Sequence, residues 1–437
     1  MPILFKNMNV IVMGLGLHGG GVGVAKFLAK RGAQVLVTDL KTKEELRESL
    51  NKLKKYTKIK YILGRHRIGD FKNADLIIKN PGVPKESKYL QIARKNNVPI
   101  ETDVGLFFEY CPSEKIIGVT GTKGKSTVAT LIANLLATKY QVVLAGNIRT
   151  SVLEELPKIN KNAVIILELS SWQLEDLKDH KKSPWIAVIT NIMQDHLNRY
   201  RGIKDYIEAK KLILKFQKAD DFLILNKDDA IVRNFAKNAR GRVIFYSQKQ
   251  ALKYFGRSKL VGKHNLSNLS AALAVAKLLK IPDSSINKVL REFKGIEGRL
   301  ELIKQSRGVK YYNDTTATTP EAAIAALKMF RNIILIAGGA DKSLNFKELA
   351  KIIAKRVKSL ILLPGTATLK LRKEMEKFTV PTFEIRSMKD AVKKAGKLAK
   401  RGDIVLLSPG CASFGLFQHE FDRGKQFQKC IEELQKK

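Results

Sequence analysis

The sequence predicts an α/β protein of three domains. Apolar strands alternate with helical segments along the whole chain, which is typical of βαβ units on parallel sheets. Strands begin afresh near Asn9, Lys115 and Gly308, and the first two lead through a glycine turn into a helix. A chain of 437 residues suggests two to four domains of about 100–200 residues each. We expect the domains to span residues 1–102, 103–297 and 298–437.

The composition is that of an ordinary soluble protein, with 44% hydrophobic and 7% aromatic residues. Its three cysteines are odd in number and have no C-x-x-C spacing, which fits a reducing cytoplasm better than a disulfide framework. The apolar N-terminal stretch could pass for a signal sequence, but its glycines have the spacing of a nucleotide-binding turn. No run of 18 apolar residues occurs. We therefore expect a cytoplasmic protein without a membrane span.

The net charge of +39 is the one unusual bulk property. It is compatible with nucleic-acid binding, with a polyanionic substrate or with a lysine-rich proteome. The lysines are spread over the whole chain, and no aromatic-basic RNA-binding motif is present. We interpret most of them as solvated helix faces and expect no specific nucleic-acid partner.

The most informative segment is Gly118–Thr127, which reads GVTGTKGKST. A short apolar strand precedes it, and residues 126–136 have helical periodicity, so backbone N–H groups and a helix N-terminus would surround one anion. Lys125 would reach the β- and γ-phosphates of a nucleotide, and the Ser126 hydroxyl would bind Mg²⁺. The strict phosphate-loop pattern is missed at Val119, where its first glycine would fall. The alternative is a lysine-rich loop that merely opens a helix.

A second glycine turn, Gly14–Gly19, lies between a strand and the predicted helix Val22–Arg31 and fits the G-x-G-x-x-G pattern. An acid, Asp39, ends the next strand about twenty residues further on. Taken alone, this pattern indicates either a dinucleotide-binding unit or a turn that only packs a helix on a strand.

Several polar residues follow predicted strands, where open α/β sheets bind ligands. Glu168 ends the strand that starts at Val164 and is a candidate Mg²⁺ ligand, or else a helix cap. Asp195 and His196 follow the strand Ile186–Thr190 and suggest a metal or substrate position, or else a surface histidine. Lys210 lies in a helical segment whose periodicity favours an ordinary solvated lysine.

Further polar clusters carry weaker signals. The segment Gly262–Asn268 starts the predicted helix Ala271–Leu279. Asn265 and Asn268, three apart on the first turn, could grip a nucleotide or cap the helix. The remaining clusters fall at strand ends of the last domain, where each could equally be a turn: Arg299, Asn313–Thr318, Lys342 and Ser408–Phe414.

Taken in order, these segments resemble the Mur ligase family over essentially the whole chain. The strongest matches are Gly121–Thr127, Glu168–Gln173, Asn191–His196, Lys210, His264–Asn268 and Asn313–Thr318. Leu407–Phe414 and Arg423–Gly424 resemble the D-glutamate-adding branch, and the Asp-Asn-Pro-Arg run of other branches is absent. The chain departs from the family at Thr316, where lysine is usual, and at His18, where a small polar residue is usual.

The resemblance implies an ATP-dependent ligase that joins D-glutamate to UDP-N-acetylmuramoyl-L-alanine through an acyl phosphate. This reaction belongs to peptidoglycan precursor synthesis. We expect the protein to be a monomer. It implies a Rossmann-like first domain for the UDP substrate, a central phosphate-loop ATPase domain and a Rossmann-like third domain for D-glutamate. The UDP-substrate residues would be Gly16, Leu17, His18, Asp39, Lys41, Gly82, Asn147 and His196. The ATP residues would be Gly121, Thr122, Lys123, Gly124, Lys125, Ser126, Thr127, Asn268, Arg299 and Asp314. The D-glutamate residues would be Thr318, Lys342, Ser413 and Phe414.

The resemblance also implies two Mg²⁺ sites, with Ser126 and Glu168 at the first and His196 and a carbamylated Lys210 at the second. Lys125, His196 and Lys210 would be the catalytic residues. Three other hypotheses rank below this one. They are a Mur or folylpolyglutamate-type ligase with another amino acid or acceptor, an NAD-dependent oxidoreductase built on residues 1–102, and a nucleic-acid-stimulated ATPase.

Overall fold

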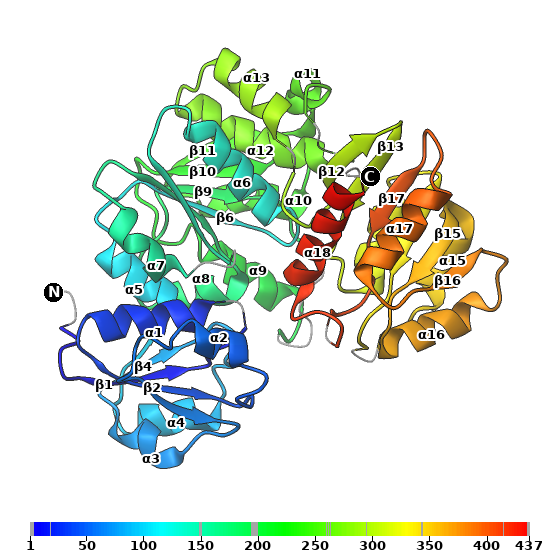
Figure 1. Ribbon diagram of the computed structural model, residues 1–437. Coiled ribbons are helices and arrows are strands. Elements are labelled where there is room, and N and C mark those ends of the chain that lie inside the picture. The colour runs from blue at the N-terminus through cyan, green and yellow to red at the C-terminus, as the bar shows by residue number, and fades with distance from the viewer. Residues whose placement is uncertain are drawn as a thin grey trace. The chain divides into compact units, whose positions relative to one another are not determined.

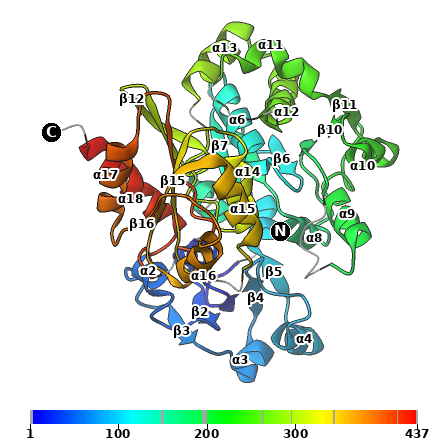
Figure 2. The ribbon, with the colours of Figure 1, turned by 90° about the vertical axis from the view of Figure 1, so that its right-hand side faces the viewer.

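A computed structural model describes residues 4–17, 19–147, 151–193, 200–258, 260, 262, 264–293, 295–341, 344–413 and 415–434. It contains three sheets flanked by helices, as Figures 1 and 2 show. The chain divides into two compact units, Met1–Phe255 with His264–Val289, and Gly256–Lys263 with Leu290–Lys437. The first unit holds two of the sheets and the second unit holds the third.

The first sheet is entirely parallel, in the order β3-β2-β1-β4-β5. Its central strands are continuously apolar because helices cover both faces of such a sheet. The strands are β1 (Asn9–Met13), β2 (Gln34–Asp39), β3 (Lys60–Leu63), β4 (Leu76–Lys79) and β5 (Ile100–Thr102). The helices are α1 (Gly20–Lys30), α2 (Arg47–Asn51), α3 (Ile68–Asn73) and α4 (Lys88–Lys95). Helix α1 therefore begins two residues before its predicted start.

The second sheet is also parallel, in the order β11-β10-β9-β6-β8-β7. Its strands are β6 (Ile116–Thr120), β7 (Val142–Gly146), β8 (Val164–Glu168), β9 (Ile186–Ile189), β10 (Phe222–Asn226) and β11 (Arg242–Tyr246). The helices of this part of the chain are α5 (Asp103–Tyr110), α6 (Lys125–Leu136), α7 (Val152–Glu155), α8 (Ser171–Leu177), α9 (Ile203–Lys211), α10 (Ala230–Arg233), α11 (Leu252–Phe255), α12 (His264–Leu278) and α13 (Asp283–Glu292). Three 3₁₀ turns accompany them, η1 (Leu156–Lys158), η2 (Asn234–Asn238) and η3 (Gln248–Ala251).

Helix α12 begins at His264, before the predicted bound at Ala271. Asn265 and Asn268 lie in its first turns, as the sequence predicts. The Asn268 amide donates to Asn265 Oδ1 at 2.8 Å, and both side chains are buried. This pairing satisfies part of the polar surface that usually keeps asparagine out of a helix interior.

The third sheet has the order β12-β13-β17-β14-β15-β16. Its strands are β12 (Glu301–Ser306), β13 (Val309–Asn313), β14 (Ile333–Ala337), β15 (Val357–Leu362), β16 (Thr382–Glu384) and β17 (Ile404–Leu407). Its helices are α14 (Pro320–Leu327), α15 (Lys347–Arg356), α16 (Thr366–Met375), α17 (Met388–Leu398) and α18 (Glu420–Glu433). Strand β12 pairs antiparallel with β13, whereas the other pairings are parallel.

The sequence analysis did not predict β12. Its residues are mostly half-buried and mix charged with apolar side chains, so no period-two apolar pattern marks it. Arg307 and Gly308 connect it to β13, and both have positive φ angles, of 50° and 78°. Two such central residues make the tight hairpin turn whose twist matches that of the strands.

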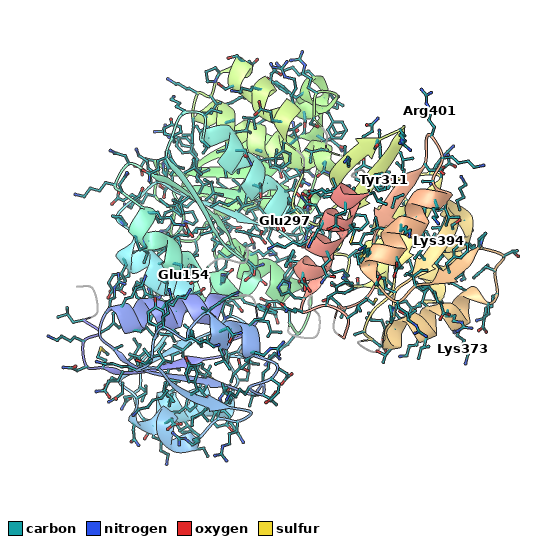
Figure 3. All side chains as sticks on the ribbon, in the orientation of Figure 1. Glu154, Glu297, Tyr311, Lys373, Lys394 and Arg401 are labelled. Carbon is teal, nitrogen blue, oxygen red and sulfur yellow. The ribbon has the colours of Figure 1, made fainter. Side chains whose placement is uncertain are left out.

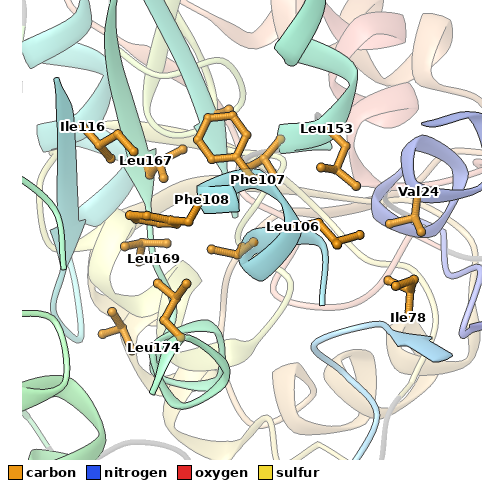
Figure 4. Close-up of a cluster of buried hydrophobic side chains, with 14 of the residues drawn as sticks. Val24, Ile78, Leu106, Phe107, Phe108, Ile116, Leu153, Leu167, Leu169 and Leu174 are labelled. Atoms are coloured by element: carbon orange, nitrogen blue, oxygen red, sulfur yellow. The ribbon is translucent and has the colours of Figure 1, made fainter. Parts of the chain in front are cut away.

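One buried hydrophobic cluster connects the first two sheets, and a separate cluster lies between the first sheet and the helices α3 and α4. Val24 and Ile78 of the first sheet's layer belong to the same buried cluster as Leu106, Leu153 and Leu174 from around the second sheet (Figure 4). The third sheet has separate clusters on its two faces. The residues before and after position 102 are therefore packed together as one unit.

Candidate active site

The predicted phosphate loop lies between β6 and α6. Helix α6 begins at Lys125, and its N-cap Gly124 has a left-handed backbone with φ of 85°. A Cβ atom at Gly124 would lie 2.2 Å from Oδ1 of Asn268 on α12. The absence of a side chain at residue 124 thus lets Asn268 approach the loop closely. The structure brings together two parts of the predicted ATP site that are far apart in the sequence.

The loop is held by residues that directly follow β9. Thr122 N donates to Asn191 O at 2.8 Å, and Lys123 N donates to Asn191 Oδ1 at 2.9 Å. The Thr190 hydroxyl donates to Lys123 O at 2.7 Å. Asn191 is marked by the sequence only as the start of the matching segment Asn191–His196, and Thr190 is not a predicted site residue. Their place at the end of a parallel strand could have indicated both.

Lys125 is bonded to its own loop in this structure. Its Nζ atom donates to Gly121 O and Thr122 O, each at 3.0 Å. The side chain is only partly buried, and so is that of Ser126 beside it. The ammonium group and the hydroxyl therefore stand at the N-terminus of α6, where an anion is favoured.

Glu168 ends β8, the strand next to β6, and pairs with Val119 in the sheet. The residue is 2% exposed. Its Oε1 atom accepts from Asn147 Nδ2 at 3.3 Å, whereas Oε2 is buried with no hydrogen-bond partner among the residues that the structure describes. A buried carboxylate oxygen without a partner is costly, and a hard cation would satisfy it. The Glu168 carboxylate and the Ser126 hydroxyl are oxygen donors of the kind that fits Mg²⁺.

Lys210 is buried, with 1% of its surface exposed. Its Nζ atom donates to Thr120 Oγ1 at 3.3 Å, at the end of β6, and lies 4.8 Å from the centre of the Tyr206 ring. The interpretation as a solvated lysine is therefore wrong, because α9 turns Tyr206, Ala209 and Lys210 inward on one face. An amine at this position is next to the first residue of the phosphate loop.

The first glycine turn is hydrogen-bonded to the end of β2 and packs against the loop after β4. Asp39 ends β2 and accepts from Gly16 N at 3.0 Å and from Lys41 N at 2.9 Å. Asn80 follows β4, and its Oδ1 atom accepts from Gly82 N at 3.1 Å. The predicted UDP-substrate residues Gly16, Asp39, Lys41 and Gly82 therefore surround one turn, and the partly buried Leu17 lies beside them.

Asn147 lies apart from this turn, beside Glu168. Its backbone N–H donates to Glu168 O at 2.9 Å, in addition to the contact of its side-chain amide with the carboxylate. The structure thus places a residue predicted for the UDP substrate against a predicted metal ligand.

In the second unit, Asp314 follows β13 and is 5% exposed. It accepts from Ser408 Oγ at 2.8 Å and from Leu300 N at 3.2 Å. Burial raises the pKa of Asp314 to about 7, although these hydrogen bonds and the charge of Arg299 act in the opposite direction. Arg299, predicted for ATP, is exposed one residue before Leu300.

The loop after β17 carries the predicted D-glutamate residue Ser413, which is buried. Arg423 on α18 is completely buried and ties this loop to the one after β13, where Thr318 lies. Its guanidinium donates to Thr315 O at 2.9 Å, to Thr315 Oγ1 at 3.1 Å and to Cys411 O at 3.3 Å. Burial lowers the pKa of Arg423 to about 10. The sequence marked Arg423 only through the family resemblance.

Five predicted residues lie outside the described residues, namely His18, Asp195, His196, Lys342 and Phe414. Within the described part of the chain, no group of three or more His, Cys, Asp or Glu residues could hold a metal ion. No helix there is long and apolar enough to cross a membrane.

Three family profiles match successive parts of the chain. They are the Mur ligase MurD-like N-terminal domain over residues 8–102, the Mur ligase middle domain over 119–276, and the Mur ligase glutamate ligase domain over 298–411. Curated relatives named UDP-N-acetylmuramoylalanine–D-glutamate ligase match over nearly their whole length. The protein of Roseiflexus sp. strain RS-1 is 43% identical over 97% of this chain and 98% of its own. That of Borreliella burgdorferi strain ZS7 is 41% identical over 98% of each chain.

Among solved structures, UDP-N-acetylmuramate-alanine ligase MurC from Thermotoga maritima has a TM-score of 0.62 at 18% identity, over 98% of this chain and 100% of its own. The phosphate loop, the buried acid beside it and the parallel sheets define a nucleotide-binding α/β protein. The chain belongs to the Mur ligase family.

Family membership confirms the predicted family and the α/β class with three Mur ligase domains. It overturns the reading of residues 1–102 as part of an oxidoreductase, because that segment matches a Mur ligase N-terminal domain. The individual site residues and the boundaries at 102 and 297 stay predictions.

Proposed function

We propose that this protein is an ATP-dependent amide ligase that adds D-glutamate to UDP-N-acetylmuramoyl-L-alanine in peptidoglycan precursor synthesis. The relatives that carry this activity in their names align from end to end with the chain. The observation in the structure that carries the proposal is the group around the carboxyl end of β6. There the phosphate loop, the unpaired Glu168 oxygen and the buried Lys210 amine meet.

ATP and Mg²⁺ are the cofactors expected of this family. The backbone of Gly121–Thr127 would hold the phosphates, and Lys125 would exchange its two loop carbonyls for phosphate oxygens. Ser126 and Glu168 would hold the first Mg²⁺, which supplies charge neutralisation for the transferred group. Asn268, Arg299 and Asp314 would bind the rest of ATP. The contact between Asn268 and Gly124 supports the role of Asn268.

The second Mg²⁺ would be held by His196 and a carbamate on Lys210. An ammonium group is costly to bury, whereas CO₂ converts a neutral amine into an anionic oxygen ligand that suits a hard cation. The burial of Lys210 and its contact with Thr120, next to the loop, support this assignment.

The reaction overcomes the poor reactivity of a carboxylate as an acyl donor. The γ-phosphoryl group passes to the alanyl carboxylate, and the C–O bond to phosphate then breaks as the D-glutamate amine forms the amide. The residues around the first glycine turn, with His18, Asn147 and His196, would hold the UDP substrate. Thr318, Lys342, Ser413 and Phe414 would hold D-glutamate. We expect Lys125, His196 and Lys210 to act on the charge that develops during transfer.

The decisive experiment measures phosphate release with ATP and UDP-N-acetylmuramoyl-L-alanine while the amino acid is varied. D-glutamate should be used and L-glutamate rejected, because mispaired buried polar groups can cost a factor of about 10⁴–10⁵ in discrimination. Equal kcat/KM for the two enantiomers, or preference for another amino acid, would support the alternative of a differently specific ligase. The panel also tests the departure at Thr316, where the family usually has lysine. In this chain the Thr316 hydroxyl donates to Gly298 O at 2.9 Å.

We also expect the protein to act as a cytoplasmic monomer with small-molecule substrates and no specific nucleic-acid partner. Light scattering at the working concentration tests the monomer. Phosphate release should not rise when DNA or RNA is added, whereas a nucleic-acid-stimulated ATPase would respond in a salt-dependent way.

A further inference from the structure

A buried ion pair connects the first sheet to a helix of the second. Lys79 is the last residue of β4, and its Nζ atom lies 3.0 Å from Oδ2 of Asp176 on α8. The two side chains are only 5% and 2% exposed. Asp103, the first residue of α5, is buried beside them and is influenced by both charges. Three ionisable side chains therefore lie together in one buried region of this unit.

Lys79 is joined directly to the loop that supports the first glycine turn. The next residue, Asn80, donates its backbone N–H to Met13 O at 2.9 Å and caps Gly82 through its side chain. A Cβ atom at Gly14 would lie 3.0 Å from Cβ of Asn80, so the two loops are in close contact. Lys79, Asn80, Gly14 and Asp103 line one small cavity at this place. A displacement of Lys79 would therefore shift the glycine turn.

Asp176 is connected to Glu168 by a short segment that hydrogen bonds hold in place. Ser170 caps α8 two residues after Glu168, and its hydroxyl accepts from Gln173 N at 3.2 Å. The Gln173 side chain in turn accepts from Ser170 N at 3.0 Å, which completes a capping box. Fewer than two turns of a capped helix thus separate the ion pair from the carboxylate beside the phosphate loop.

Among the described residues, the boundary between the first and second sheets carries two other ion pairs, both more exposed than the pair of Lys79 and Asp176. They are Glu101 with His180 at 3.0 Å and Lys26 with Glu154 at 2.7 Å. Figure 4 shows the apolar part, in which Val24 and Ile78 belong to one cluster with Leu106 and Leu153. Apolar burial stabilises without preferring one direction. A buried ion pair pays a desolvation penalty and is favourable only in good geometry, so it selects one relative position of its two elements.

We propose that Lys79 and Asp176 are positioning residues. Their ion pair fixes the position of the loop that contains Asn80 relative to the loop that follows Glu168. The inference rests on the proposed function, in which the first loop serves the UDP substrate and the second serves Mg²⁺ and ATP. The alanyl carboxylate must then reach the γ-phosphoryl group across this boundary. A misplacement of about 1 Å can cost about 10²-fold in rate even when each ligand still binds.

The test removes the ion pair without leaving a buried charge alone. The variant is Lys79→Met/Asp176→Leu in an Asp103→Asn background, and it is compared with Asp103→Asn alone and with the wild type. Similar-sized apolar replacements of a whole buried ionic group are often neutral for stability. We expect the melting temperature to stay within a few degrees. The separate Kd values for the UDP substrate and for a non-hydrolysable ATP analogue should stay within about threefold. The kcat for phosphate release should fall about 10–100-fold.

One of the more exposed ion pairs across the same boundary provides the matched control. Lys26 on α1 and Glu154 on α7 are 2.7 Å apart, with side chains 24% and 30% exposed (Glu154 is labelled in Figure 3). Solvent screens this pair, so Lys26→Met/Glu154→Leu in the same background should leave kcat within about twofold.

A kcat of the Lys79→Met/Asp176→Leu variant within about threefold of its background overturns the inference, and so does a loss of rate fully explained by weaker binding of either ligand. If that variant does not fold, Lys79→Gln/Asp176→Asn in the same background removes both charges with a smaller change of shape. The Gln side chain is one atom shorter than that of Lys, so the 3.0 Å contact is also lost, and the same two criteria apply. A wild-type protein that forms no amide with any amino acid overturns the proposed function instead, since binding of the two nucleotide ligands is measured separately.

Discussion

At the level of single residues, Lys125 is the side chain most directly tied to phosphoryl transfer. It stands at the first position of α6 and is held by Gly121 O and Thr122 O. We expect Lys125→Ala to lower kcat by about 10²–10³, the usual cost of one charge-stabilising contact. The far-ultraviolet circular dichroism spectrum and melting temperature should not change. Lys115→Ala, at the exposed opposite end of β6, is the control. Turnover of Lys125→Ala within a few-fold of wild type would contradict the phosphate-loop assignment.

Lys210 is buried, so its replacement separates a catalytic role from a structural one. If it carries a carbamate, Lys210→Ala leaves a metal one oxygen ligand short, and acetate added to the assay should restore part of the lost activity. A purely structural role predicts a lower melting temperature and no response to acetate. Lys211→Ala changes the partly exposed neighbour that pairs with Glu208, and this control should remain fully active.

At the level of elements, the packing of α1 against α7 depends on Gly23. A Cβ atom there would lie 2.1 Å from Cβ of Ser151. Gly23→Ala gains about 1 kcal/mol of helix propensity, but the overlap costs about 1–3 kcal/mol, so we expect a net loss of stability in chemical denaturation. Ser151→Gly should restore it in the double variant. Gly69→Ala in α3 meets no atom within 4 Å and should be neutral or stabilising. A Gly23→Ala protein as stable as wild type would show that the two helices can move apart at little cost.

The elements that could be predicted are those in which neighbouring residues determine the backbone conformation. The loop between β6 and α6 was placed to within one residue, because its left-handed backbone at Gly124 requires glycine. Lys210 was misjudged because a lone lysine in a helix carries no periodic signal. Only its spacing of four from the buried Tyr206 hints at a shared face. The pair of Lys79 and Asp176 joins residues 97 apart, so no local pattern could reveal it.

At the level of the whole molecule, the Asp103 carboxyl makes stability depend on pH. Burial, followed by repulsion from Asp176, raises the pKa of Asp103 from 3.8 to about 6, against the opposing effects of the Val104 N–H and Lys79. Because the folded pKa exceeds the unfolded one, the native state binds more protons between these values. The contribution of Asp103 to stability is therefore full below about pH 4 and is lost as the pH rises through about 6.

We expect Asp103→Asn to remove this loss. Asparagine keeps an oxygen that can accept from Val104 N, the 2.8 Å bond that the carboxylate makes, and it carries no charge to desolvate. A shift of about two pKa units corresponds to at most about 3 kcal/mol, so the variant should be more stable than wild type by about 1–3 kcal/mol at pH 7.5. Near pH 4 the two proteins should be about equal. The measurement is chemical denaturation followed at several pH values, with tryptophan fluorescence reporting on the unit that contains Trp172 and Trp185. A stability difference that does not change between pH 4 and 7.5 would show that the Asp103 carboxyl titrates no differently in the folded and unfolded chains.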